Sequence, residues 1–143
     1  MTDQERKTLL TQIEKALNKH QDKVAFAYLF GSSLIEDYQY KSDVDVAVYL
    51  KKDYLALGGQ SLDTFIFDAK LSIHADLCRS LKRNDVDLVI LNTLKNYFLE
   101  DDVIRKGLVV YGKDHPYRQL YEVKRQHEII DFKQQRKAIL GAR

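Results

Sequence analysis

The sequence VAFAYLFGS, at residues 24–32, is followed ten residues later by DVDVAVYL, at residues 43–50. Residues 24–30 are apolar and aromatic, too few for a buried helix, and stopped by Gly31, so they predict a buried strand. Residues 43–50 alternate in the manner of a strand with two different faces. We therefore expect two strands connected through a Gly-Ser turn, with the rest of the chain built around them.

Two carboxylates stand at the start of the second strand. Strand side chains alternate between faces, so Asp43 and Asp45 point to one side while Val44 and Val46 point to the other. Burying adjacent like charges without a counter-charge is unfavourable, so we expect a cation between them. Mg²⁺ fits this position, because it is typically held by one or two carboxylates plus substrate phosphates. The turn after residue 30 offers N–H groups and a hydroxyl to such a phosphate.

The composition is that of an ordinary globular protein of one domain. The chain has 143 residues, with 23 Lys and Arg against 21 Asp and Glu and a formal net charge of +2. This near-neutral balance gives no overall electrostatic footprint for nucleic acid, which is therefore not an expected partner. Cys78 is the only cysteine, and the charged N-terminus has no apolar segment of signal-peptide or membrane length. We expect a cytoplasmic protein with no membrane contact, and the scattered histidines predict no zinc site.

The other segments carry helix and strand patterns in turn. Apolar spacing predicts helices at residues 3–19, 61–81, 94–106 and about 114–140, strands at 85–91 and 108–111, and a loop at 51–59. Asp85 and Asp87 share one face of the strand at 85–91, which supplies a third candidate carboxylate. The apolar residues of the last helix trace no single stripe, so part of that helix is available to a partner.

Gly31-Ser32, ten residues and then Asp43-x-Asp45 together resemble the signature of the nucleotidyltransferase superfamily, which has the polymerase-β-like fold, and all four motif positions match. The resemblance implies an α/β (α+β) fold, a small mixed sheet flanked by helices with a C-terminal helix. It also implies a third carboxylate on a later strand, which Asp87 matches and for which Asp85 is the alternative. In that family such carboxylates hold Mg²⁺, and the resemblance implies two Mg²⁺ ions in this site.

The roles implied by this resemblance fall on two groups of residues. The catalytic and metal-binding residues would be Asp43, Asp45 and Asp87. The residues that contact the phosphates of the co-substrate ATP would be Gly31, Ser32 and Ser33.

Chain length narrows the resemblance to the minimal nucleotidyltransferases (MNT). Only about thirty residues follow Gly112, whereas larger relatives carry an added helical domain. We expect residues 1–112 to form the MNT domain and residues 113–143 to form a helix that packs on this domain or on a partner. The chain is similar to the MntA-type antitoxins of type VII-like HEPN/MNT toxin-antitoxin pairs.

The resemblance to these antitoxins implies a function. Such an antitoxin is an adenylyltransferase (AMPylase) that transfers AMP from ATP to a tyrosine of its cognate HEPN ribonuclease toxin. The toxin's motif, Arg-x4-6-His-x-Tyr, is absent from this sequence, so the chain resembles the modifier and not the nuclease. Two alternatives stay open: transfer to a small molecule such as an aminoglycoside, and a non-catalytic antitoxin that acts by binding alone. The sequence specifies neither the nucleotide, nor the number transferred, nor the oligomeric state.

Overall fold

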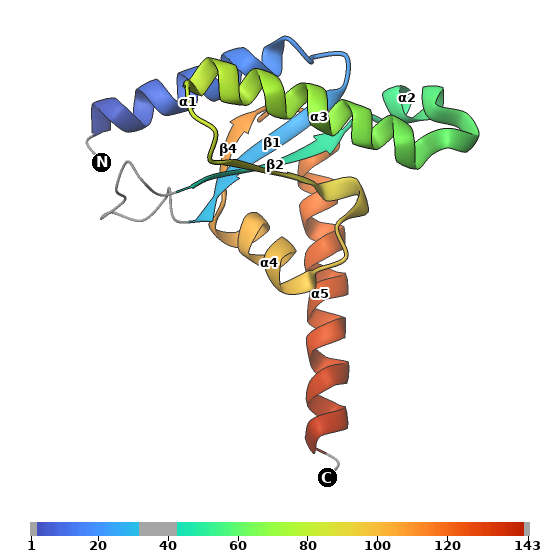
Figure 1. Ribbon diagram of the computed structural model, residues 1–143. Coiled ribbons are helices and arrows are strands. Elements are labelled where there is room, and N and C mark those ends of the chain that lie inside the picture. Colours follow the sequence, from blue (N-terminus) through green and yellow to red (C-terminus); the bar gives the residue numbers. More distant parts are fainter. Residues whose placement is uncertain (1–2, 32–42, 142–143) are drawn as a thin grey trace.

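The computed structural model describes residues 3–31 and 43–141, and its centre is a four-stranded mixed sheet (Figure 1). The strands are β1 (Val24–Phe30), β2 (Val44–Leu50), β3 (Val86–Ile90) and β4 (Leu108–Tyr111), in the order β3-β2-β1-β4. Strand β1 is antiparallel to both β2 and β4, while β2 and β3 run parallel. The two strands that carry the sequence motif therefore lie side by side in the middle of the sheet.

Helices cover both faces of this sheet. On one face lie α1 (Asp3–Asn18) and α3 (Leu62–Leu81), and on the other lie α4 (Tyr97–Lys106) and α5 (Arg118–Gly141) (Figure 1). Two apolar faces of a sheet each need a covering layer, and these helices provide one for each. The arrangement confirms the predicted mixed α/β fold with a C-terminal helix.

The alternation of β2 decides which residues enter which core. Val44, Val46, Val48 and Leu50 are buried and face α1 and α3. Ala47, between them, faces α4 and α5. Because Asp45 lies two residues before Ala47, its side chain belongs to the α4 and α5 face of the sheet.

Strand β1 is the most deeply buried element. All seven of its residues are buried, as expected for a strand paired on both sides and covered on both faces. Its alternation is interrupted by a register shift between Val24 and Phe26 in the pairing with β2. As a result Ala25 and Phe26 both contribute to the α4 and α5 core, whereas Val24 and Ala27 contribute to the other.

Four local predictions are wrong in detail. The expected loop at 51–59 contains a short helix, α2 (Lys52–Leu55), and a 3₁₀ segment, η2 (Ala56–Ser61). The ring of Tyr54 stacks on Phe65 of α3 at 4.6 Å, which anchors this segment despite its paired glycines. Helix α4 begins at Tyr97 rather than at residue 94, because the side chain of Asn96 caps it by accepting a hydrogen bond from Leu99 N at 3.1 Å.

The third wrong prediction concerns the end of β3. The strand ends at Ile90, and Leu91 begins a 3₁₀ turn, η3 (Leu91–Thr93). The side chain of Asn92 in this turn accepts a hydrogen bond from Leu50 N at 2.8 Å and donates one to Leu50 O at 3.1 Å. This side chain takes the place of a further backbone pair and ties the end of β2 to the end of β3.

The fourth wrong prediction concerns the start of the C-terminal helix, which begins at Arg118 rather than at about residue 114. The residues before it form turns, in which His115 N donates to Gly112 O and Arg118 N donates to His115 O. The helix extends beyond the rest of the fold. Its first half packs beside α4, and its second half projects away from the sheet (Figure 1). Across residues 3–31 and 43–141, no helix is long and apolar enough to cross a membrane.

Candidate active site

Two of the predicted carboxylates meet at one end of the sheet. Asp45 of β2 and Asp87 of β3 are register partners in the parallel pair. Both point to the α4 and α5 face, since Ala47 and Val89, two residues further along each strand, pack into that core. Asp45 is half-buried and Asp87 is exposed, so the pair opens to solvent. The parallel pairing of β2 and β3 thus brings together residues that are 42 positions apart in the sequence.

Burial and negative charge act together on Asp45. Burial, then the charge of Asp87 and a hydrogen bond with it, and finally the charge of Asp43 raise the pKa of Asp45 to about 6. Such a rise means that each ionised neighbour disfavours the next ionisation. A cation placed against these carboxylates would therefore relieve a repulsion already present in the fold.

Gly31 makes room for the Asp45 carboxylate at the end of β1. Its backbone has φ +78°, a conformation that residues with a Cβ rarely adopt. A Cβ built on Gly31 would also collide with Oδ2 of Asp45. Because Phe30 is the register partner of Asp45, the turn that starts at Gly31 lies directly beside the carboxylate. The residue type at position 31 is thus fixed by two independent steric conditions.

Asp85, the alternative third carboxylate, forms an ion pair with Arg83. The guanidinium of Arg83 donates two hydrogen bonds to it, from Nε to Oδ1 at 2.5 Å and from NH2 to Oδ2 at 2.6 Å. This hydrogen bonding to Arg83 lowers the pKa of Asp85, opposite to the shift at Asp45. Asp87 is the residue that lies opposite Asp45, and Asp85 forms a local ion pair with Arg83.

The other predicted site residues are placed less completely. Asp43 lies directly before β2 and is exposed. Ser32 and Ser33, the predicted phosphate contacts, lie outside the described residues. The described part of the site therefore consists of Gly31, Asp43, Asp45 and Asp87.

The donor set of this site suits a metal ion that arrives with a substrate. Within the described part of the chain, no three His, Cys, Asp or Glu side chains are grouped closely enough to hold an ion by themselves. The site instead offers neighbouring carboxylates, and burial together with the negative charge of its neighbours raises the pKa of Asp45. Because Mg²⁺ commonly takes only one or two protein carboxylates and completes its shell with phosphates and water, these residues fit it.

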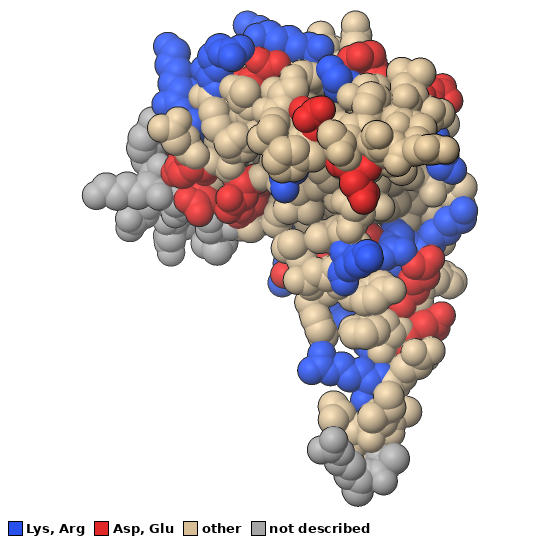
Figure 2. Space-filling model, turned by 45° about the vertical axis from the view of Figure 1, so that its right-hand side comes forward, with Lys and Arg blue, Asp and Glu red and all other residues tan. Residues whose placement is uncertain are grey.

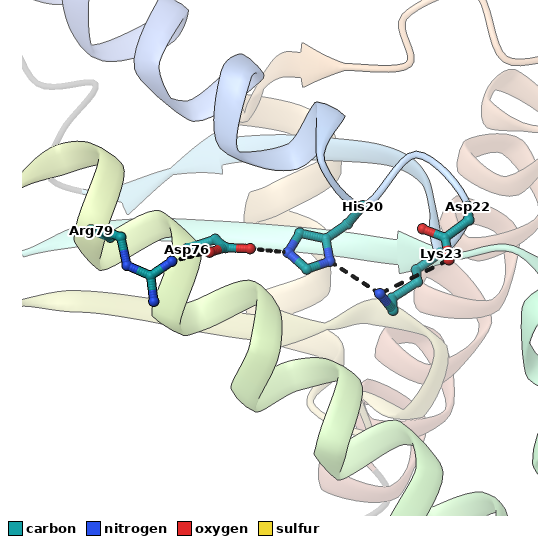
Figure 3. Close-up of polar contacts among 5 residues, drawn as sticks. All are labelled: His20, Asp22, Lys23, Asp76 and Arg79. Atoms are coloured by element: carbon teal, nitrogen blue, oxygen red, sulfur yellow. Dashed lines mark hydrogen bonds and ion pairs between the residues drawn. The ribbon is translucent and has the colours of Figure 1, made fainter.

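A second polar cluster lies on the opposite side of the sheet and serves the fold (Figure 3). His20, just after α1, is buried, and its Nε2 is 2.6 Å from Oδ2 of Asp76 on α3. Lys23 Nζ is 3.3 Å from the other ring nitrogen, so a neutral ring carries its proton on Nε2 and donates it to Asp76. Arg79 also donates to Asp76 at 2.8 Å, and these contacts lower the pKa of Asp76. The cluster fastens the end of α1 to α3.

Sequence reasoning missed two features of the carboxylate site. One is the contact between Gly31 and Asp45, for which the sequence signal was only the glycine at a strand end. The other is the pairing of Arg83 with Asp85. The sequence shows that Arg83 and Asp85 are two residues apart. It does not show that Asp87 lies opposite Asp45, because strand register depends on tertiary pairing.

Comparisons with known proteins agree with this geometry. The family model described as "Polymerase beta, Nucleotidyltransferase" matches residues 11–116. A search of curated proteins found no match. Among solved structures, a toxin-antitoxin with AMP-PNP is similar at 26% identity and a TM-score of 0.69, over 93% of this chain and 96% of that chain.

Two further solved structures show the same likeness. The mutant toxin-antitoxin MntA-HpeT is 25% identical with a TM-score of 0.68, over 93% of this chain and 96% of that one. A tri-AMPylated Shewanella oneidensis HEPN toxin in complex with MNT antitoxin is 25% identical with a TM-score of 0.63, over 94% of each chain. Since the family model covers most of the sequence, including strand β2 with Asp45 and strand β1 with Gly31 directly after it, the chain belongs to the polymerase-β nucleotidyltransferase family.

Proposed function

We propose that this chain is the antitoxin of a HEPN/MNT toxin-antitoxin pair and acts as a Mg²⁺-dependent protein adenylyltransferase. Its substrate would be a tyrosine of the cognate HEPN toxin, and its co-substrate would be ATP. The observation that carries the proposal is the pairing of Asp45 with Asp87 beside the Gly31 turn. The similar solved structures, with AMP-PNP in one and an AMPylated HEPN toxin in another, support AMP transfer to a toxin as the reaction.

The proposed step is an in-line displacement at the α-phosphorus of ATP. The tyrosyl oxygen forms a bond to that phosphorus while the bond to the bridging oxygen of the β-phosphate breaks. Pyrophosphate leaves, and the phenolic proton passes to the carboxylate of Asp87. Asp87 suits this role because its side chain is exposed at the end of the sheet, where an acceptor from another protein has access.

Asp43 and Asp45 would hold Mg²⁺ at the triphosphate, with Asp87 completing the set. When bound, Mg²⁺ neutralises the charge that develops on the departing pyrophosphate and lowers the pKa of the attacking hydroxyl. Asp45, with a pKa of about 6, is mostly ionised at neutral pH and is available as a ligand. The turn at Gly31 allows the backbone to approach phosphate without steric obstruction from a side chain.

Positioning accounts for most of the rate in reactions of this kind, and the fold supplies it. Asp45 is fixed by a strand that is paired on both sides, and Asp87 is aligned with it by the parallel ladder. A rigid carboxylate pair holds its geometry before the substrate arrives, which reduces the reorganisation required in the transition state. One similar solved structure carries two aspartate-to-glutamate substitutions two positions apart, the spacing of Asp43 and Asp45 here.

The test is to follow label from ATP into the cognate toxin. Label on the α-phosphorus is expected to enter the toxin in the presence of Mg²⁺, while label on the γ-phosphorus is expected to stay in solution. Incorporation of the γ-label would indicate phosphorylation instead. Absence of both labels, with the toxin still inhibited, would favour neutralisation by binding alone. Turnover on an aminoglycoside in the absence of any protein partner would favour the small-molecule alternative.

A further inference from the structure

The end of α5 is a helical surface that residues 3–31 and 43–133 leave exposed. All 24 residues of α5 are described, and only Tyr121 and Ile129 among them are buried. Every residue from 134 to 141 is exposed. We call residues 134–141 the α5 overhang, and Figure 1 shows the end of α5 extending past α4.

The face of α5 that packs on α4 continues into the overhang. The ring of Phe132 stacks on Tyr97 of α4 at 4.6 Å and lies edge-on to Phe98 at 6.1 Å. Ile139 follows Phe132 by seven residues and therefore lies on the same helix face two turns further along. Ile139 is 68% exposed, Leu140 is 55% exposed and Phe98 is 50% exposed. An apolar stripe thus runs from the covered part of α5 onto a part that no described residue covers.

The overhang is also positively charged. It contains Arg136 and Lys137 and no acidic residue. Lys133 donates to Asp101 of α4 at 2.8 Å, and the guanidinium of Arg136 lies over the ring of Phe98 at 5.3 Å. Figure 2 shows Lys and Arg along this projecting part of the molecule. A second copy of the chain would bring the same positive charges, so self-pairing through the overhang is opposed electrostatically.

The overhang and the carboxylate pair belong to the same side of the sheet. Helix α5 packs on the face to which Asp45 and Asp87 point. In both views the overhang projects from the body of the fold and forms a corner with it (Figures 1 and 2). A protein seated in this corner would lie on the side of the sheet from which the carboxylates are approached.

We propose that the α5 overhang, together with Phe98, is the docking surface for the protein substrate, whose matching surface is apolar with a rim of carboxylates. This inference rests on the proposed function, because the substrate is taken to be the HEPN toxin. Docking at a distance from the chemistry would hold the acceptor tyrosine near Asp87 and so convert binding energy into correct orientation. It also gives the compact chain a substrate-binding element without an added domain.

The test is the affinity of the full-length chain for the HEPN protein encoded beside it, measured by calorimetry without ATP. The double variant Ile139→Glu/Leu140→Glu is expected to bind at least about tenfold more weakly, because central apolar contacts dominate interface energies. The matched control is Leu71→Glu on α3, an equally exposed leucine (52%) on the opposite face of the sheet. The control is expected to bind as the wild type does, and thermal unfolding checks that both variants are folded.

A second readout separates this inference from the proposed function. If the wild type binds the toxin and the overhang variant does not, docking is supported even if no AMP is transferred, in which case the proposed function fails alone. If the overhang variant binds and modifies the toxin at the wild-type level, docking fails while AMP transfer stands. Failure of the wild-type protein to bind the toxin also overturns the docking proposal. So does a dimer of the free chain, seen by analytical ultracentrifugation, that the double variant dissociates.

Discussion

Asp45 and Asp87 lie opposite one another on the parallel strands β2 and β3, and burial of Asp45, followed by the charge of Asp87 and its hydrogen bond, raises the pKa of Asp45 to about 6. Two carboxyl groups in such a pair do not stabilise the fold. Their arrangement has the character of a functional site, where electrostatic strain is retained because a ligand relieves it. Several measurable consequences depend on this pair and its surroundings.

Replacing the two candidate third carboxylates separates their roles. Asp87→Asn is expected to reduce AMP transfer by about a thousandfold, since it removes a charged group placed at the reacting centre. Asp85→Asn is the matched control and is expected to keep most of the activity, because Asp85 is bound by Arg83. Its partly exposed ion pair contributes about 1 kcal/mol or less to stability. Initial rates of label transfer measure both, and equal losses in the two variants would contradict the assignment.

The stability of the metal-free protein is expected to depend on pH through Asp45. Its folded pKa of about 6 lies above the usual carboxyl value, so the folded state binds more protons than the unfolded state between about pH 4 and pH 6. The contribution of Asp45 to stability therefore falls as pH rises through this range. Asp45→Asn removes this loss and should stabilise the protein at pH 8 by about 1 kcal/mol, because solvent screens the half-buried group.

Urea unfolding of both proteins in chelator, from pH 4 to pH 8, measures this difference. The stability advantage of the Asn variant should grow as pH rises and then level off above the pKa of Asp45. A difference in the free energy of unfolding that is independent of pH would show that ionisation of Asp45 does not destabilise the fold.

Gly31→Ala tests the close approach of the β1 turn to the carboxylate. The substitution imposes a Cβ on a backbone with φ +78° and places it against Oδ2 of Asp45, so both stability and transfer should fall. Gly59→Ala is the control, because Gly59 also has a positive φ, of +55°, but a Cβ there meets nothing within 4 Å. The control should lose about 1 kcal/mol of stability from backbone strain alone and keep its activity. Equal activity in the two variants would argue against a role for the Gly31 approach.

The packing of α5 against α4 within the fold depends on a buried ion pair between the two helices. Glu100 is 1% exposed and accepts hydrogen bonds from Arg125 Nε at 2.6 Å, from Arg125 NH2 at 2.9 Å and from the Tyr121 hydroxyl at 3.0 Å. Arg125→Met strands a buried carboxylate and should cost about 3 to 5 kcal/mol. Adding Glu100→Gln to this variant should restore most of the lost stability. Denaturant unfolding of both variants checks this, and a single substitution that costs under about 1 kcal/mol would contradict the burial of the pair.

The sequence allowed the strands and their faces to be predicted with little error. Val24–Phe30 was found at its observed bounds, because its apolar run is stopped by a glycine. The two faces of β2 followed from alternation alone, since valines at every second position leave Asp45 on the other side. Long helices such as α3 were also predicted, because an apolar residue recurs at each turn.

The features that could not be predicted from the sequence depend on contacts between residues that are distant along the chain. The choice between Asp85 and Asp87 needed the register of β2 against β3, which no local pattern specifies. The helical turns after β2 were predicted as a loop, because the two glycines outweighed the stacking of Tyr54 on Phe65, which only the tertiary structure shows. The predicted roles of Ser32 and Ser33 stay predictions, as these residues lie outside the described ranges.

The most direct test of the central claim is intact mass spectrometry of the proposed HEPN toxin partner after incubation with this protein, ATP and Mg²⁺. The double variant Asp43→Asn/Asp45→Asn is the parallel control. The account predicts a mass increase of one or more AMP units with the wild type and none with the variant. An unchanged mass with the wild type, in a sample where the two proteins form a stable complex, would contradict it and assign neutralisation to binding alone.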